Sequence, residues 1–198
     1  MEREGATNGL RVVLGLGNPG ERYDDTRHNV GFRVVAELAR RRGVTLDHDE
    51  CRSDLVEVDD LLLVAPRTFM NRSGWAARCL AEGRDLSAAD FLVVYDEVHL
   101  PLGTLRLRPK GSPAGHRGLE SVLENLGTDG VPRLRLGIAP ADPPPGEALP
   151  DFVLGRFEKD EAEAVDAMIL RAADACDTWA RDGVEAAARA FNGPPADS

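Results

Sequence analysis

The chain has 198 residues, with 24 Lys or Arg against 34 Asp or Glu, which gives a formal net charge of −10. Its hydrophobic fraction of 42% is ordinary and argues against a mainly disordered chain, and one core at this length should bury roughly 70% of the surface that the unfolded chain exposes. The longest apolar runs are far shorter than the roughly 18 residues of a membrane helix, so we expect no transmembrane protein.

The N-terminus and the cysteines indicate the compartment. Residues 1–9 are charged and polar and lack the apolar core of a signal peptide, so we expect a cytoplasmic protein whose first nine residues are disordered. Cys51, Cys79 and Cys176 are odd in number and far apart. This spacing favours reduced, isolated thiols over a disulfide framework or a metal site.

Strand and helix signals alternate along the chain. Short apolar or alternating runs predict strands at residues 10–16, 55–58, 61–65, 91–95, 104–108 and 134–139. Apolar residues at helical spacing predict helices over residues 29–42, 71–83, 118–126, 160–181 and 184–191, with Trp75, Cys79 and Leu80 facing inward in the second helix and Ala164 facing the core in the fourth. Strands interleaved with helices indicate one α/β domain over residues 10–191 with a mostly parallel sheet, followed by a tail, 192–198, that should fray.

Charge is unevenly distributed along the chain. Residues 11–45 and 101–139 are locally positive, while residues 46–100 and 140–198 contain most of the acidic side chains. A solvated acidic surface explains the acidic segments but leaves the basic ones unexplained. Residues 141–150, with the sequence ADPPPGEALP, have no packing pattern and predict an exposed, stiff loop that could serve as a lid.

A glycine-rich segment follows the first predicted strand. Gly15-Leu16-Gly17-Asn18-Pro19-Gly20 matches the GxGxxG dinucleotide fingerprint, which requires its last glycine to open a helix that holds pyrophosphate. Here the next residues are polar and lack helical periodicity. A structural glycine turn is the simpler interpretation, and a nucleotide-dependent enzyme is an alternative.

Four polar side chains suggest a hydrolytic site. His28 lies at the entrance to the first predicted helix, and Asn18, Asn71 and Asp96 follow predicted strands, whose carboxyl ends line the ligand crevice in α/β sheets. An Asp bound to one imidazole nitrogen fixes the tautomer and leaves the other nitrogen to take a proton from water. Since neither Ser nor Cys stands in a nucleophile-elbow context, direct attack by water is favoured.

Together with these residues, further motifs resemble the bacterial-type peptidyl-tRNA hydrolase family. They run in order over nearly the whole chain: Gly15 to Gly20, Tyr23, Thr26-Arg27-His28-Asn29, Thr68-Phe69-Met70-Asn71-Arg72-Ser73-Gly74, Asp96-Glu97, Pro101-Leu102-Gly103, Gly115-His116, Gly118-Leu119, Arg133 to Ile138 and Phe152-Val153-Leu154-Gly155. The resemblance implies a monomeric α/β enzyme without metal or cofactor, with a twisted mixed sheet flanked by helices. Such an enzyme cleaves the ester between a peptide and the 3'-terminal ribose of tRNA and recycles tRNA from aborted translation.

The resemblance also implies roles for individual residues. His28 would be the general base and Asp96 its orienting partner, while Asn18 and Asn71 would hold the peptide and the reacting carbonyl. Further candidate substrate contacts are Tyr23, His116 and Arg117, and candidate tRNA phosphate contacts are Arg106, Arg108 and Arg133. Arginine suits the latter role because its planar fork of donors matches phosphate oxygens. Arg135 could act in the same way or form an ion pair.

Two departures from the family pattern keep an alternative open. Arg117 follows His116 where the family usually has Asn, and the predicted lid carries Asp142 and Glu147 but no Lys or Arg. A non-catalytic RNA-binding protein on the same fold is therefore the second hypothesis. The presence of Asn18, His28, Asn71 and Asp96 argues against it, since a binding module has little need of that set.

Overall fold

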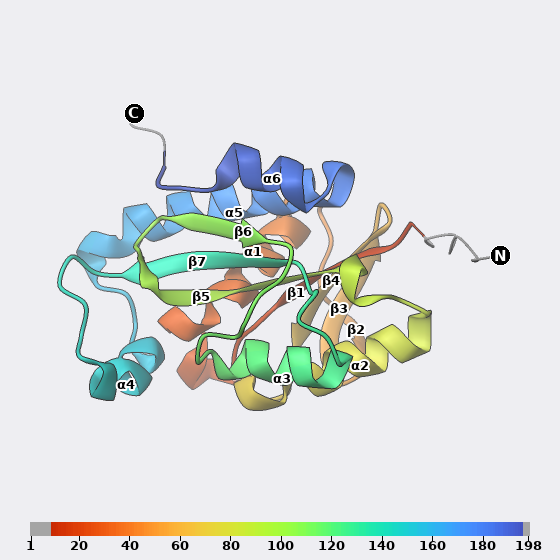
Figure 1. The fold of residues 1–198 in the computed structure, drawn as a ribbon, viewed down its shortest axis with the longest axis horizontal. Coiled ribbons are helices and arrows are strands. Elements are labelled where there is room, and N and C mark those ends of the chain that lie inside the picture. Colours follow the sequence, from red (N-terminus) through yellow and green to blue (C-terminus); the bar gives the residue numbers. More distant parts are fainter. Residues whose placement is uncertain (1–8, 196–198) are drawn as a thin grey trace.

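A seven-stranded sheet forms the centre of the computed structural model, which describes residues 9–195 (Figure 1). The strands are β1 (Arg11–Gly15), β2 (His48–Glu50), β3 (Ser53–Val58), β4 (Leu61–Pro66), β5 (Phe91–Pro101), β6 (Leu105–Arg108) and β7 (Arg133–Ala139), in the spatial order β2-β3-β4-β1-β5-β7-β6. β4, β1, β5 and β7 are parallel to one another, while β2, β3 and β6 add antiparallel edges. The expected mostly parallel mixed sheet is confirmed.

Helices cover both faces of this sheet. They are α1 (Val30–Arg41), α2 (Ser73–Arg84), α3 (Arg117–Leu126), α4 (Leu149–Leu154), α5 (Ala162–Asp182) and α6 (Val184–Phe191). Figure 1 shows α5 and α6 along one side, α2 and α3 along the other, and α4 apart at one end. Among the helices described, none is both long and apolar enough to cross a bilayer.

The core consists of two apolar clusters, one on each face of the sheet. Val13 of β1 packs with residues of α1 and α5, whereas its neighbours Val12 and Leu14 pack with residues of α2 and α3. Successive side chains of a strand point to opposite faces, so a central strand covered on both sides must be apolar at every position. This explains the continuous apolar run in β1.

Close contact between α1 and the strands positions the segment that contains His28. A Cβ atom on Gly15 would collide with the carbonyl oxygen of Gly31 in α1, and a Cβ atom on Gly31 would collide with the carbonyl oxygen of Val94 in β5. The glycines at these positions therefore let the helix approach the sheet more closely than any side chain would allow. This packing role supports the interpretation of the glycine-rich segment as a structural turn.

Several local expectations are wrong. Trp75 does not face inward but is 47% exposed, whereas Ala76, Ala77 and Leu80 are buried. A Cβ atom on Gly74 would collide with the backbone of Ser121 in α3, so the small residues of α2 face α3 and turn Trp75 outward. Ala164 likewise is exposed, with Val165 facing the core in its place.

The strand predictions were incomplete at two points. β2 consists only of His48, Asp49 and Glu50, so it carries no apolar signal. β5 continues past the predicted end at Tyr95 to Pro101, although its regular pairing with β7 shifts between Glu97 and Pro101. Asp96 therefore lies inside a strand rather than just after one.

The prediction of three isolated thiols is also wrong. Cys51 and Cys79 form a disulfide with their Cα atoms 5.7 Å apart, while Cys176 is free and buried, as expected. Cys51 occupies the turn between β2 and β3, and Cys79 lies in α2. The hairpin folds back against α2, so two cysteines 28 residues apart in sequence become neighbours through tertiary packing alone.

The C-terminal segment is attached to the edge strand β6. The side chain of Asn192 accepts a hydrogen bond from the backbone of Leu107 (2.6 Å), and Gly193 forms a bridge with Leu105. Asn192 and Gly193, which the sequence predicted to belong to a frayed tail, are thus bonded to β6 in the structure. Residues 1–8 and 196–198, also expected to be disordered or frayed, lie outside the described part of the chain.

Candidate active site

A cavity of about 620 Å³ opens beside the carboxyl ends of β1 and β5. Its walls come from the loop after β1, the turn that precedes α1, the end of β5, the N-terminus of α3 and the segment around α4. The predicted site residues that line it are Asn18, His28, Asn71, Asp96, His116 and Arg117. Residues distant in sequence therefore converge where the sheet topology predicted a crevice.

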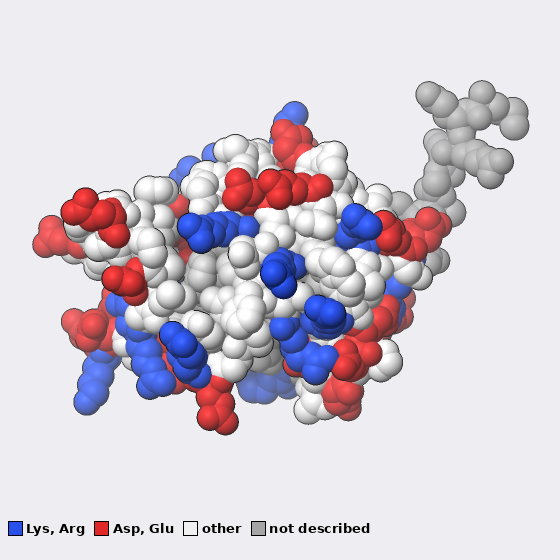
Figure 2. All heavy atoms as spheres, turned by 90° about the horizontal axis from the view of Figure 1, so that it is seen from below, with Lys and Arg blue, Asp and Glu red and all other residues white. Residues whose placement is uncertain are grey.

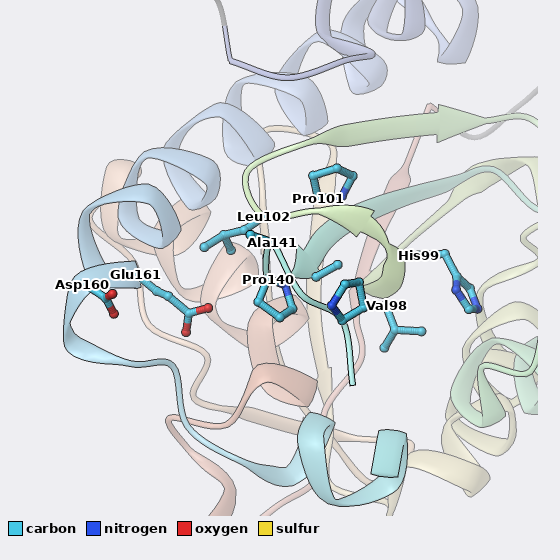
Figure 3. Close-up of a pocket in the computed structure, with 10 residues that line it drawn as sticks. Val98, His99, Pro101, Leu102, Pro140, Ala141, Asp160 and Glu161 are labelled. Atoms are coloured by element: carbon cyan, nitrogen blue, oxygen red, sulfur yellow. The ribbon is translucent and has the colours of Figure 1, made fainter. Parts of the chain in front are cut away.

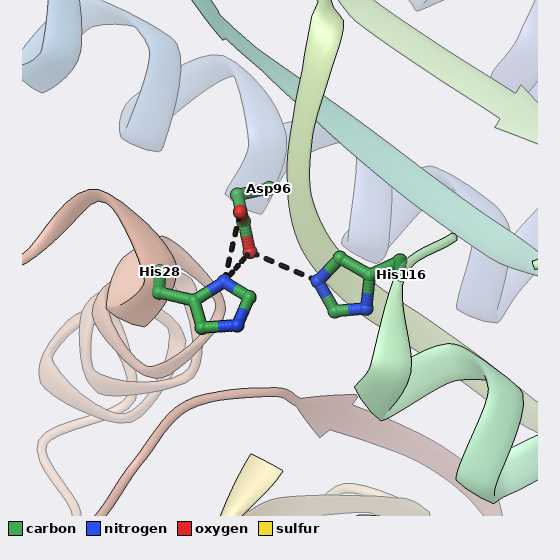
Figure 4. Close-up of side chains that lie close together, drawn as sticks. All are labelled: His28, Asp96 and His116. Atoms are coloured by element: carbon green, nitrogen blue, oxygen red, sulfur yellow. Dashed lines mark hydrogen bonds and ion pairs between the residues drawn. The ribbon is translucent and has the colours of Figure 1, made fainter. Parts of the chain in front are cut away.

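The His28 ring lies against the Asp96 carboxylate. Its Nδ1 atom is 2.8 Å from Asp96 Oδ1 and 2.9 Å from Oδ2 (Figure 4). Asp96 is 2% exposed, and the side chain of His28 is 14% exposed. A carboxylate at this distance holds the proton on Nδ1 and leaves Nε2 with a lone pair, as a general base requires.

His116 is a second imidazole on the same carboxylate. Its Nε2 atom lies 3.0 Å from Asp96 Oδ1, and its Nδ1 atom accepts a hydrogen bond from the backbone N–H of Leu119 (3.1 Å), which makes His116 the N-cap of α3. Since Nδ1 accepts, a neutral His116 carries its proton on Nε2 and donates it to Asp96. The helix start thus fixes the tautomer of His116, and His116 in turn holds the carboxylate.

The tautomer of His116 disfavours metal binding at this cluster. The candidate ligand atoms of His28, Asp96 and His116 all lie within 4.8 Å of one another, and two imidazoles with a carboxylate could in principle hold a transition metal. Metal ligation would need a lone pair on His116 Nε2, but the N-cap hydrogen bond puts the proton there. These three residues therefore fit a hydrogen-bonded relay better than a metal site.

Burial and charge act in opposite directions on the two central groups. Burial alone would lower the pKa of His28, but the charge of Asp96 and its hydrogen bond outweigh burial and raise that pKa above 6.5. Burial would raise the pKa of the Asp96 carboxyl, but the facing His28 and His116 rings outweigh it and hold this pKa well below its usual range. Asp96 therefore stays ionised, and His28 titrates above its ordinary pKa.

Asn18 is held by a network that the sequence did not reveal. Its side-chain Oδ1 accepts the backbone N–H of Met70 (2.8 Å), and its backbone forms two hydrogen bonds with the side chain of the buried Asn29, each 2.9 Å. Because Oδ1 already accepts this bond, the amide N–H groups of Asn18 are the part of its side chain that is wholly free for a ligand. Asn29 lies directly after His28 in the sequence, which was the available signal for its role.

Arg27 is a second residue of the site that the sequence reasoning missed. Its buried guanidinium donates to the Arg156 carbonyl and to Glu161 (2.9 Å), and lies 4.4 Å from the centroid of the Phe152 ring. These contacts attach the segment that contains α4 to the turn beside His28. The expected lid, 141–150, overlaps this segment and is not a loop throughout, because a 3-10 turn covers Gly146–Ala148 and α4 begins at Leu149.

The remaining candidate substrate contacts differ in position. Asn71 and Arg117 are exposed and line the cavity. Tyr23 is half-buried and lies outside the set of described residues that line the cavity, with the Arg22 guanidinium 4.8 Å from its ring centroid. The geometry therefore supports Asn71 and Arg117 as substrate contacts more than Tyr23.

Of the three arginines expected to contact phosphate, Arg133 is positioned for a different task. It is 2% exposed, and its guanidinium donates to the backbone carbonyls of Val131 (2.9 Å), Asp129 (2.7 Å) and Gly111. These bonds brace the loop that leads to His116. The guanidinium donors of Arg133 are therefore already used inside the protein, which argues against the expected phosphate contact.

The neighbouring arginines remain accessible. Arg108 is exposed and Arg106 is half-buried on β6, opposite Arg133 and Arg135 of β7 in the strand register. Arg135 pairs with Glu97 at 2.5 Å, which was one of the two roles expected for it. Figure 2 shows Lys and Arg side chains around a largely uncharged, hollowed centre, with acidic side chains along the edges of this face.

Comparison with known proteins identifies the family. The family model described as peptidyl-tRNA hydrolase matches residues 12–198. A peptidyl-tRNA hydrolase of Methylacidiphilum infernorum is 46% identical over 179 residues, covering 90% of this chain and 95% of that protein, and one of Geobacillus kaustophilus is 44% identical over 172 residues, covering 85% and 91%.

Solved structures agree with this assignment. A crystal structure of peptidyl-tRNA hydrolase from Acinetobacter baumannii superposes with a TM-score of 0.85 at 29% identity, covering 97% of this chain and all of that one. A peptidyl-tRNA hydrolase crystallised with n-propanol gives a TM-score of 0.87 at the same identity and coverage. Sequence match, fold and site geometry lead to one conclusion: the chain belongs to the peptidyl-tRNA hydrolase family, whose members are hydrolases that act on ester bonds.

Proposed function

We propose that this chain hydrolyses the ester between a peptide and the 3'-terminal ribose of tRNA by means of water activated by His28. The observation that carries the proposal is the contact between His28 and the buried Asp96 at the wall of an open cavity. Such a pair combines a fixed tautomer with a free ring nitrogen facing solvent. Membership of the family supplies the substrate class.

The proton transfers follow from the tautomer of His28. Nε2 takes a proton from water while the water oxygen attacks the ester carbonyl, and the imidazolium that forms is stabilised by Asp96 through Nδ1–H. Collapse of the tetrahedral intermediate breaks the bond to the ribose oxygen, which takes the proton back from Nε2. The products are a peptide carboxylate and a tRNA with a free 3'-terminal ribose hydroxyl.

The two asparagines are assigned complementary parts. Met70 binds Oδ1 of Asn18 and leaves its amide N–H groups free, so Asn18 is assigned to the ester carbonyl oxygen as negative charge develops there. Asn71 is exposed, and its side-chain oxygen is assigned to the amide N–H of the peptide. A free aminoacyl ester carries an ammonium group instead, whose desolvation disfavours its cleavage.

Binding of the tRNA is assigned to Arg106 and Arg108 on β6, and to Arg117 at the wall of the active-site cavity. Support comes from the exposure of Arg108 and from the position of Arg117 at the cavity wall. Phosphate contacts of this kind release counterions, so affinity for tRNA should fall steeply with added salt.

A monomer in the cytoplasm suffices for this reaction. Every residue assigned to it comes from one chain, and a tRNA substrate is a cytoplasmic molecule. The disulfide between Cys51 and Cys79 removes the cysteine argument for a reducing compartment, so the proposed localisation depends on the substrate. The alternative of a non-catalytic RNA-binding protein gains no support, because His28, Asp96 and Asn18 are all assembled around the cavity.

The test is release of labelled N-acetyl-amino acid from N-acetyl-aminoacyl-tRNA by the purified chain. We expect cleavage of this substrate and much slower cleavage of the same tRNA carrying a free amino acid. Equal cleavage of the two substrates would contradict the asparagine assignment. Absence of cleavage with intact tRNA binding would favour the RNA-binding alternative.

A further inference from the structure

A second cavity, of about 700 Å³, lies beside the candidate active site. Figure 3 shows its lining: Val98 and His99 at one end, Pro101, Leu102 and Pro140 in the middle, and Asp160 and Glu161 at the other end. Its volume falls within the range of cavities that bind small molecules. The mechanism proposed above does not use it.

This cavity adjoins the active-site cavity. Val98 and His99 line both cavities. The segment after β7 contributes different residues to each cavity: Ala139 to Ala141 and Pro143 to the second, and Gly146 and residues of α4 to the first. The two cavities are therefore neighbours, with Val98 and His99 of β5 in the wall of each.

The chemistry of the second cavity suits a peptide and not RNA. Its walls are formed largely by Val98, Leu102 and prolines, and the charged residues among its described lining are Asp160 and Glu161, both acidic. Glu161 is engaged by Arg27, whereas Asp160 is exposed. Acidic groups without a nearby basic lining repel phosphate and attract a cationic side chain.

The strand also sets the distance from the reacting ester. Along β5, Val98 and Pro101 lie two and five positions beyond Asp96, which corresponds to at most roughly 7–17 Å at the rise of an extended chain, since β5 is irregular between Glu97 and Pro101. An extended peptide covers that span with about two to five residues. The second cavity is therefore within reach of the second to fifth peptide residues counted from the ester.

We propose that this cavity is a peptide subsite that receives the second to fifth residues of the substrate and prefers apolar side chains ending in a positive charge. The inference rests on the proposed hydrolysis of peptidyl-tRNA and adds the direction in which the peptide and the RNA extend from the ester. The peptide leaves the ester past His99 toward Asp160, while the RNA leaves toward the arginines of β6. Lysine fits best, since its apolar stem can lie along Leu102 while its ammonium group meets Asp160.

The test compares three substrates on the same tRNA: N-acetyl-aminoacyl-tRNA, and two N-acetyl-tetrapeptidyl-tRNAs that differ only in Lys or Glu at the third residue from the ester. We expect kcat/KM for the Lys peptide to exceed that for the Glu peptide by about tenfold. Asp160→Lys should reverse this preference, and Ala141→Trp, which fills the cavity from an exposed position, should abolish it. Neither variant should change cleavage of the short substrate.

Glu163→Lys is the matched control, because Glu163 is an exposed acid of α5 three residues from Asp160 and lies outside the cavity lining. It should leave the Lys-to-Glu preference as in the unmodified chain. A preference that is absent, or that survives both Asp160→Lys and Ala141→Trp, would overturn the subsite while cleavage of the short substrate upheld the hydrolase. Failure to cleave all three substrates would instead overturn the proposed function.

Discussion

The two walls of the active-site cavity are built in opposite ways. On one wall, Asp96 and Asn18 are buried, and hydrogen bonds hold the Asp96 carboxylate and the Asn18 side-chain oxygen in place. On the other, α4 contains no buried residue, and Leu154 is 42% exposed. The reacting groups therefore belong to a rigid, buried wall. The wall that must admit peptides of varying sequence is weakly packed, and Arg27 attaches it to the rest of the protein.

The strongest test of the rigid wall is His28→Ala. Loss of a general base should lower kcat by about 10³-fold with little change in KM, because the base acts on water rather than on binding. Single-turnover cleavage of N-acetyl-aminoacyl-tRNA measures the effect. His48→Ala, at an exposed position of the edge strand β2, is the control and should retain full activity. Retention of most activity by the His28 variant would remove the assigned base.

Asp96→Asn should act through the pH profile as well as the rate. In the unmodified chain, Asp96 raises the pKa of His28 above 6.5, so kcat/KM should rise with pH as His28 loses its proton above that value. Without the carboxylate charge, burial should lower the pKa of His28, and the rise should move to lower pH. We also expect a loss of about 10²-fold at the plateau. An unshifted profile would separate Asp96 from His28.

Substitutions at His116 can separate its two contacts. His116→Asn keeps a side-chain acceptor at the N-cap of α3 but should be too short to reach Asp96, so activity should fall about tenfold, as loss of a hydrogen bond to a charged group implies. His116→Ala loses both contacts and should be less stable than the Asn variant by about 0.5–2 kcal/mol. Urea unfolding of the two variants measures this difference. Equal stability would show that the capping bond contributes nothing.

Arg108 and Arg133 differ in the same way, since Arg108 is exposed and Arg133 is buried. Arg108→Ala should leave thermal stability unchanged and reduce the salt slope of tRNA binding by about one. Arg133→Ala should leave that slope unchanged but destabilise the chain by about 2–3 kcal/mol, since three backbone carbonyls lose their donor. Filter binding over a salt series and thermal unfolding distinguish the two. A reduced slope in the Arg133 variant would restore its predicted phosphate contact.

The smallest effect is expected on the weakly packed wall. Leu154→Ser changes a side chain that is largely exposed, so stability should change by less than about 0.5 kcal/mol. KM for N-acetyl-aminoacyl-tRNA should rise about two- to threefold through lost apolar contact, with kcat unchanged. A large fall in kcat would mean that this wall takes part in the chemistry.

The sequence by itself determined the periodic elements and the residues that meet at the carboxyl edge of the sheet. Continuous apolar runs mark β1 and β5 because both faces of a central strand are buried, and His28, Asn18 and Asp96 could be brought together because parallel strands end at one edge. β2 escaped prediction because its three residues are all polar.

Tertiary structure decided which donors and acceptors of each polar side chain remain free for a ligand. The sequence could not separate Arg133 from Arg108, or the free donors of Asn18 from its committed oxygen, because these depend on carbonyls and amides supplied by distant segments. The disulfide between Cys51 and Cys79 and the tautomer of His116 depend in the same way on packing. The spacing of apolar residues along a chain indicates which segments are buried. Hydrogen-bond partners are fixed only when the chain is folded.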